Sequence, residues 1–124
     1  MKKLNQRPEV GWFLVRLGLA AVFIVHGWAK LADLPGTVGF FSALGLPTFL
    51  AYVVAVIEFG GGLAMLLGIF ARVAGALLAI VMLGAIITVK FKLGFTGGYE
   101  FDLMLLLAAL AVAAAGPGRL SIKR

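Results

Sequence analysis

Six polar side chains that lie within or beside apolar stretches could do chemistry in this sequence: Arg16, His26, Lys30, Glu58, Glu100 and Asp102. An imidazole or a carboxylate can exchange protons with a bound molecule, and a basic side chain can hydrogen-bond its oxygen atoms. No nucleophile–base set, phosphate loop or cluster of metal ligands accompanies them in the sequence. A lone histidine also cannot build a bis-histidine haem site. This pattern argues against a metal centre and against a self-sufficient enzyme.

Glu58 lies in the middle of a long apolar run. An ionised carboxylate there is costly, so its surroundings must either pair with it or keep it protonated. At 1.5 Å per residue, Arg16 and His26 lie roughly 7–8 Å to either side of the midplane, within reach of Glu58 if the first two spans are neighbours. Two interpretations stay open: a purely structural Arg16–Glu58 ion pair, or a role for Glu58 in handling protons or a ligand.

His26 and Lys30 are one helical turn apart and therefore share a face. Together with Glu100 on the last span, they can outline a polar pocket that opens outward and has Glu58 at its floor. We predict Glu58 and His26 as candidate proton-handling groups. The candidate cofactor-binding residues are His26, Lys30, Arg16, Glu58 and Glu100. The alternative for His26 is a hydrogen-bonded packing residue.

Helices that span a membrane must position these side chains. Of the 124 residues, 63% are hydrophobic, and the mean hydropathy is +1.13, whereas soluble domains average about 45–50% apolar residues. The runs are apolar on all sides, unlike the alternating strands of a membrane β-barrel. We predict an all-α integral membrane protein, one domain over residues 1–124, folded as an up-and-down bundle. Its four transmembrane helices are expected at residues 10–31, 48–70, 73–92 and 99–115.

The connection at residues 32–47 is too short and interrupted to span a membrane and too apolar to be a solvated loop. We predict a short interfacial or re-entrant segment between the first and second spans. Small residues recur every four positions on the later spans, which favours close helix packing within the bundle and leaves a homo-oligomer open.

The formal net charge of +6 is concentrated at the chain ends and span boundaries. Eight basic residues fall on the side of the termini and three on the other side. The positive-inside rule then places both termini in the cytoplasm and explains the charge without nucleic acid. The chain has no cysteine, so thiol chemistry and disulfides are excluded.

Six short pieces of the sequence, in order and at suitable spacings, resemble the DoxX family over nearly the whole chain. They are Arg16-Leu17-Gly18 with His26-Gly27-Trp28-Ala29-Lys30-Leu31, Leu44-Gly45-Leu46-Pro47, Glu58-Phe59-Gly60-Gly61-Gly62, Gly68-Ile69-Phe70-Ala71-Arg72, Gly98-Tyr99-Glu100, and Gly116-Pro117-Gly118-Arg119-Leu120-Ser121. The resemblance implies a small four-span protein of the bacterial inner membrane that is linked to redox or oxidative-stress systems. It also implies a membrane lipid environment and a redox partner protein. The family's charged positions map onto Arg16, His26, Lys30 and Glu58.

Two functional hypotheses follow. In the first, the polar pocket binds a quinone or another lipophilic redox partner: His26 and Lys30 hydrogen-bond a carbonyl oxygen, Glu58 relays protons and Arg16 sets its charge. In the second, the chain is a non-catalytic membrane scaffold or assembly subunit in which the Arg16–Glu58 pair is purely structural. A small-solute transporter is less favoured, because four spans rarely enclose a path.

Overall fold

The computed structural model describes residues 7–122, and within that range the chain is helical apart from its turns. The α-helices are α1 (Pro8–Ala32), α2 (Leu34–Ala43), α3 (Thr48–Leu67), α4 (Ala71–Ala85) and α5 (Glu100–Ala115). α4 continues through a π-helical turn, Ile86–Lys90, and a 3-10 turn, Phe91–Leu93. The basic residues Lys2, Lys3, Lys123 and Arg124, which entered the predicted topology, lie outside the described residues.

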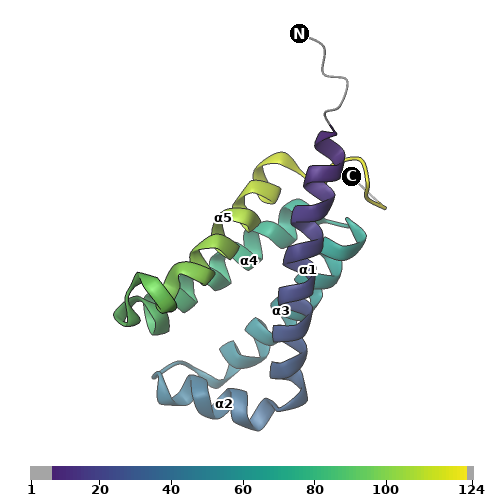
Figure 1. Ribbon diagram of the computed structural model, residues 1–124. Coiled ribbons are helices and arrows are strands. Elements are labelled where there is room, and N and C mark those ends of the chain that lie inside the picture. The colour runs from purple at the N-terminus through teal and green to yellow at the C-terminus, as the bar shows by residue number, and fades with distance from the viewer. Residues whose placement is uncertain (1–6, 123–124) are drawn as a thin grey trace.

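The long helices α1, α3, α4 and α5 run alternately up and down, so that the described chain ends lie at one end of the bundle (Figure 1). α1 packs along α3 and α4 packs along α5, while α2 lies at the opposite end, called the distal end below. In the described part of the chain, four stretches are long and apolar enough to cross a membrane: Pro8–Ala32, Thr48–Leu67, Ala71–Leu93 and Phe95–Ala115. Residues 7–122 contain no strand. The predicted all-α fold, with four spans and a short connecting segment, is confirmed.

Local chemistry sets where α1 and α2 begin and where α3 ends. Pro8 occupies the first turn of α1, where its missing N–H costs nothing. Asp33 leaves helical geometry at φ −138°, and its carboxylate accepts a hydrogen bond from Gly36 N, which caps α2. At the other end of the bundle, Gly68 adopts a left-handed conformation with φ 73° and donates its N–H to Ala64 O. α3 therefore ends at Leu67, three residues before the end of the span predicted at residues 48–70.

Two glycines on facing helices fix how α1 and α3 lie against each other. A β-carbon on Gly27 would collide with the backbone of Phe59, and one on Gly62 would lie 2.8 Å from Ile24 N. Small residues let helix backbones approach closely, which is a main source of packing energy between helices in lipid. The two antiparallel helices are thus held with Gly27 level with Phe59 and with Ile24 level with Gly62.

Buried apolar side chains fill the space between the long helices; they include Leu19, Phe23, Met65, Leu78, Leu105 and Val112. Large apolar side chains also face outward: Val25 is 64% exposed and Ile80 66% exposed. An apolar exterior is compatible with lipid, which is as apolar as these side chains. Against this background, three charged residues between positions 7 and 122 are buried: Arg16, Glu58 and Asp102.

Candidate functional site

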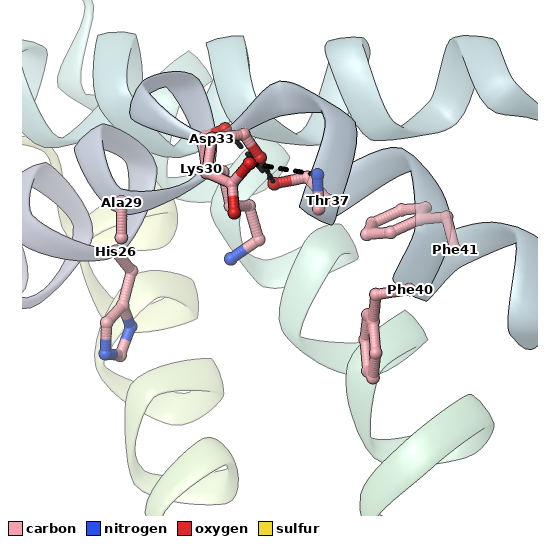
Figure 2. A pocket seen from close by; sticks show the side chains of 8 residues that line it. His26, Ala29, Lys30, Asp33, Thr37, Phe40 and Phe41 are labelled. Atoms are coloured by element: carbon pink, nitrogen blue, oxygen red, sulfur yellow. Dashed lines mark hydrogen bonds between the residues drawn. The ribbon is translucent and has the colours of Figure 1, made fainter.

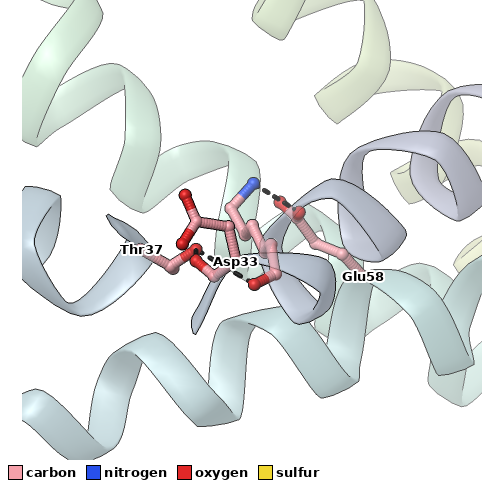
Figure 3. A network of polar contacts seen from close by, with 4 residues as sticks. Asp33, Thr37 and Glu58 are labelled. Carbon is pink, nitrogen blue, oxygen red and sulfur yellow. Dashed lines mark hydrogen bonds and ion pairs between the residues drawn. The ribbon is translucent and has the colours of Figure 1, made fainter. Parts of the chain in front are cut away.

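Glu58 is paired with Lys30 across the α1–α3 contact. Lys30 Nζ lies 2.7 Å from Glu58 Oε1, which is both an ion pair and a hydrogen bond. The Glu58 side chain is 4% exposed and that of Lys30 is 29% exposed. Figure 3 shows this contact beside the polar groups at the corner between α1 and α2. The cost of a buried carboxylate is therefore offset by a close and directional cationic partner.

The predicted Arg16–Glu58 ion pair is wrong, because Arg16 lies at the other end of the bundle. Gly27 on α1 lies close to Phe59 on α3, and Glu58 directly precedes Phe59. Glu58 therefore lies at about the height of Gly27. Arg16 precedes Gly27 by eleven positions, or roughly 16 Å along a helix. Lys30, one turn beyond Gly27, is at the right height. The second span is therefore shifted along the first relative to the symmetric placement that the sequence suggested.

Arg16 instead ties α1 to the end of α3 and to the C-terminal segment. Its Nη1 donates to Met65 O at 2.9 Å and its Nη2 donates to Leu120 O. The guanidinium carbon lies 5.5 Å from the centre of the Phe13 ring. Its side chain is buried, and within residues 7–122 its Nε has no hydrogen-bond partner. The carbonyl of Met65 belongs to the last turn of α3, where the helix dipole favours a cation.

A pocket of about 390 Å³ opens at the distal end, between the end of α1 and α2. Its lining residues are His26, Ala29, Lys30, Asp33, Gly36, Thr37, Phe40 and Phe41. Figure 2 shows the Lys30 side chain extending between His26 on α1 and Phe40 on α2. The pocket therefore combines aromatic walls with charged and polar groups, a combination typical of sites for small molecules.

The corner between α1 and α2 is held by hydrogen bonds of two pocket residues. Asp33 Oδ1 accepts from Gly36 N at 3.1 Å. Thr37 Oγ1 lies 3.1 Å from Lys30 O and 3.0 Å from Asp33 O, and its hydroxyl donates there. These bonds fix α2 on the end of α1 and so shape the pocket. Neither Asp33 nor Thr37 was predicted as a site residue, although an aspartate two residues before a proline is a recognisable helix-start signal.

His26 is exposed on α1 and lies edge-on to Phe101 of α5, with ring centroids 6.4 Å apart. Its ring makes no hydrogen bond to another residue in the described part of the chain. The prediction of a hydrogen-bonded packing histidine is therefore not met among residues 7–122. The imidazole nitrogens are open to a ligand at the mouth of the pocket.

Glu100 belongs to a different part of the distal end. It begins α5 and accepts a hydrogen bond from Gly97 N, within its own loop. Its neighbour Asp102 is buried and forms an ion pair with Lys90 at 3.4 Å. Of the predicted site residues, the structure brings His26 and Lys30 into the pocket and Glu58 against Lys30, and it places Arg16 and Glu100 elsewhere. Residues 7–122 contain no group of three or more metal-ligating side chains.

This arrangement can bind a polar group that is carried on an apolar ring. The ammonium group of Lys30 has three donors, and Glu58 Oε1 accepts a hydrogen bond from one of them. Asp33 contributes an acceptor and His26 contributes either a donor or an acceptor. The bond to Glu58 holds the ammonium group in place and leaves two of its three donors for other acceptors.

These features define a multi-pass helical membrane protein of four spans, with an ion pair between two of them and a polar pocket at one end. The DoxX family model matches residues 11–91, and the chain belongs to the DoxX family. CatD of Bacillus subtilis (strain 168), whose name provisionally calls it an oxidoreductase, is 43% identical over 91% of this chain and 84% of that protein. The inner membrane protein YqjF of Escherichia coli (strain K12) is 34% identical over 100% of this chain and 95% of its own length.

A third relative is the membrane protein Rv3486 of Mycobacterium tuberculosis (strain ATCC 25618 / H37Rv), which is 35% identical over 89% of this chain and 77% of its own length. No solved structure matches the chain. The relatives therefore establish the family and the location in a membrane, and the names of these three proteins assign no ligand.

Proposed function

We propose that the chain is a membrane subunit of a redox system that binds a quinone, or another lipophilic molecule with polar ring substituents, in the pocket between α1 and α2. One observation carries the proposal: Lys30, whose ammonium group is held by buried Glu58, lines a pocket whose other walls include aromatic rings. The provisional oxidoreductase name of CatD agrees with it.

The geometry suits a flat ring with an oxygen substituent. Phe41 is buried and Phe40 is 52% exposed, so together they offer one enclosed and one accessible aromatic surface. The two rings already contact each other edge-on, with centroids 6.2 Å apart, so a flat ligand ring packs against them in a further offset or edge-on contact. Lys30 and His26 then donate hydrogen bonds to the ring oxygen, and Glu58 is the group that accepts or supplies a proton through Lys30. Arg16 and Glu100 do not line this pocket, so the proposal gives them no contact with the ligand.

The charge distribution supports an orientation with both termini in the cytoplasm of a bacterial inner membrane. Arg7 precedes α1, Arg72 is in the first turn of α4 and Arg119 follows α5, so all three lie at the end of the bundle opposite α2. The distal end carries Lys30, Lys90 and Lys92, together with Asp33, Glu100 and Asp102. By the positive-inside rule the pocket then lies on the outer side of the membrane. Electron transfer in this scheme belongs to a redox partner protein, with or without a homo-oligomer of this chain.

A second candidate is a non-catalytic assembly subunit, and the same ion pair favours it. The Lys30–Glu58 contact between α1 and α3 also serves folding, because Lys30 offsets the cost of burying the Glu58 carboxylate. In this case the outward apolar surface contacts a partner protein and the pocket has no ligand. In the scaffold hypothesis, the structural partner of Glu58 is therefore Lys30 and not Arg16.

Direct binding separates the two candidates. Purified protein in lipid nanodiscs is titrated with a decyl-substituted benzoquinone, and retention above that of empty nanodiscs is measured. Two variants test the pocket: His26→Leu, and Lys30→Met combined with Glu58→Gln so that no charge is left unpaired. Each is expected to weaken binding at least about tenfold, because charge-assisted hydrogen bonds are lost. Lys92→Met, an exposed lysine outside the pocket, is the matched control and should bind normally. Retention equal to empty nanodiscs would leave the scaffold as the function.

A further inference from the structure

Asp33 is the one pocket-lining carboxylate whose charge has no ionic partner among residues 7–122. The ion pairs in that range join Lys30 to Glu58 and Lys90 to Asp102. Asp33 Oδ1 accepts the N–H of Gly36, whereas Oδ2 accepts no hydrogen bond from a described residue. The side chain is exposed and lines the cavity. A pocket residue thus presents a free anionic acceptor.

The cations near the pocket do not cancel this charge. Lys30 is neutralised by buried Glu58 at 2.7 Å, so this pair contributes donor atoms without net charge. His26 lies further back along α1 and packs edge-on to Phe101. The lining therefore offers hydrogen-bond donors on Lys30. It also offers an unpaired negative charge and a free acceptor oxygen on Asp33. A ligand that fits both must itself offer a hydrogen-bond donor beside an acceptor.

We propose, on the basis of the proposed function, that Asp33 makes the pocket select the reduced, hydroquinone form of its ligand over the oxidised form. A ring hydroxyl of a hydroquinone donates its hydrogen to Asp33 Oδ2, while its oxygen accepts from Lys30 or His26. A quinone carbonyl can only accept, so it gains the Lys30 contact but turns its lone pairs toward a carboxylate. Asp33 acts by favouring one form and by repelling the other, which is how specificity is usually built.

The expected size of the preference follows from one charge-assisted hydrogen bond. Such a bond corresponds to about a tenfold to hundredfold change in affinity. The repulsion of the carbonyl adds to this discrimination, and partial exposure of Asp33 reduces it, so about tenfold is the expected preference. In the membrane system, such a subunit retains the product of quinone reduction or the substrate of quinol oxidation.

Asp33 also caps α2, and the test must keep that cap. Asn is as good a capping residue as Asp, so Asp33→Asn removes the charge and preserves the hydrogen bond to Gly36 N. Asp33→Ser, which retains a capping oxygen, is the second variant should the first fold poorly. Glu9→Gln removes one carboxylate at the start of α1, at the opposite end of the bundle, and serves as the matched control.

The measurement compares retention of a decyl-substituted benzoquinone and of its hydroquinone by protein-loaded nanodiscs under argon, with empty nanodiscs as background. We expect the unmodified protein and Glu9→Gln to hold the hydroquinone about tenfold more tightly than the quinone. Asp33→Asn and Asp33→Ser should lose most of that preference by weakening hydroquinone binding, with quinone binding unchanged or tighter. Equal retention of both forms by the unmodified protein, or an unchanged preference in the two variants, overturns the role of Asp33 alone. Retention of neither form overturns the proposed function as well.

Discussion

The two partners of the buried ion pair differ in enclosure, and this difference predicts an asymmetric effect of mutation. The Glu58 side chain is 4% exposed, whereas that of Lys30 is 29% exposed. Lys30→Met takes from the buried carboxylate its one ionic partner among residues 7–122. Glu58→Gln leaves an ammonium group on a flexible stem, which can swing toward the polar end of α1. We expect Lys30→Met to destabilise the fold more than Glu58→Gln.

The magnitudes follow from the cost of an unpaired charge. Removing one partner of a buried ion pair costs about 3–5 kcal/mol, and placing a charge in the middle of a span costs about 2.5–3.5 kcal/mol on insertion scales. Lys30→Met should therefore cost about 3 kcal/mol, and Glu58→Gln about 1 kcal/mol because the remaining charge is mobile and partly exposed. The double variant carries no charge at this contact and should also lie within about 1 kcal/mol of the unmodified protein. The coupling energy between the two sites is then about 3 kcal/mol.

Reversible unfolding in mixed micelles of increasing SDS content, followed by circular dichroism, measures these free energies. Lys92→Met is the control for the loss of a lysine at the distal end, because Lys92 is exposed. It should leave the unfolding midpoint unchanged. An equal cost of Glu58→Gln and Lys30→Met, or single effects that add up in the double variant, would contradict this prediction. Additivity would mean that the 2.7 Å contact contributes no coupling between the helices.

Two further predictions concern packing and the C-terminal segment. Gly27→Ala should destabilise the fold by about 1–3 kcal/mol, because its β-carbon would meet the backbone of Phe59, whereas Gly18→Ala, with open space around it, should not destabilise it in the same SDS titration. Equal effects of the two alanines would rule out the α1–α3 register described above. Arg16→Met should release the segment that contains Leu120, since it removes a buried donor to that carbonyl. Limited carboxypeptidase digestion in nanodiscs should then shorten the chain faster than in the unmodified protein, and an unchanged rate would contradict the anchoring role.

Hydropathy and short-range spacing predicted the helical architecture and part of the site. The spans follow from apolar length, and the common face of His26 and Lys30 follows from their separation by one turn. Both properties are local, so they can be read without knowing how the helices meet. The cap at Asp33 is also local, and attention to helix starts would have found it.

The partner of Glu58 is a non-local property, and for that reason it was mispredicted. The pairing depends on how far α3 is shifted along α1, which is set by the contact of Gly27 with Phe59 and by the corner that α2 makes. Placing the midpoints of two spans at the same depth ignores this shift. The same limitation applies to Arg16, whose acceptors are carbonyl groups of Met65 and Leu120. Every residue has a backbone carbonyl, so the sequence does not indicate which carbonyl groups will accept a hydrogen bond from Arg16.

A structural role and a functional role of Glu58 are compatible, because one ion pair can both stabilise the fold and position a donor for a ligand. A lone lysine near the end of a span extends its ammonium group toward the interface. Paired with Glu58, the ammonium group of Lys30 is held at 2.7 Å from a buried oxygen while its stem lines the pocket. On the proposed function, the bond that joins α1 to α3 is therefore also the bond that keeps a donor pointed at the ligand. The double variant Lys30→Met with Glu58→Gln separates these roles, since it should retain most of the stability and lose the ligand.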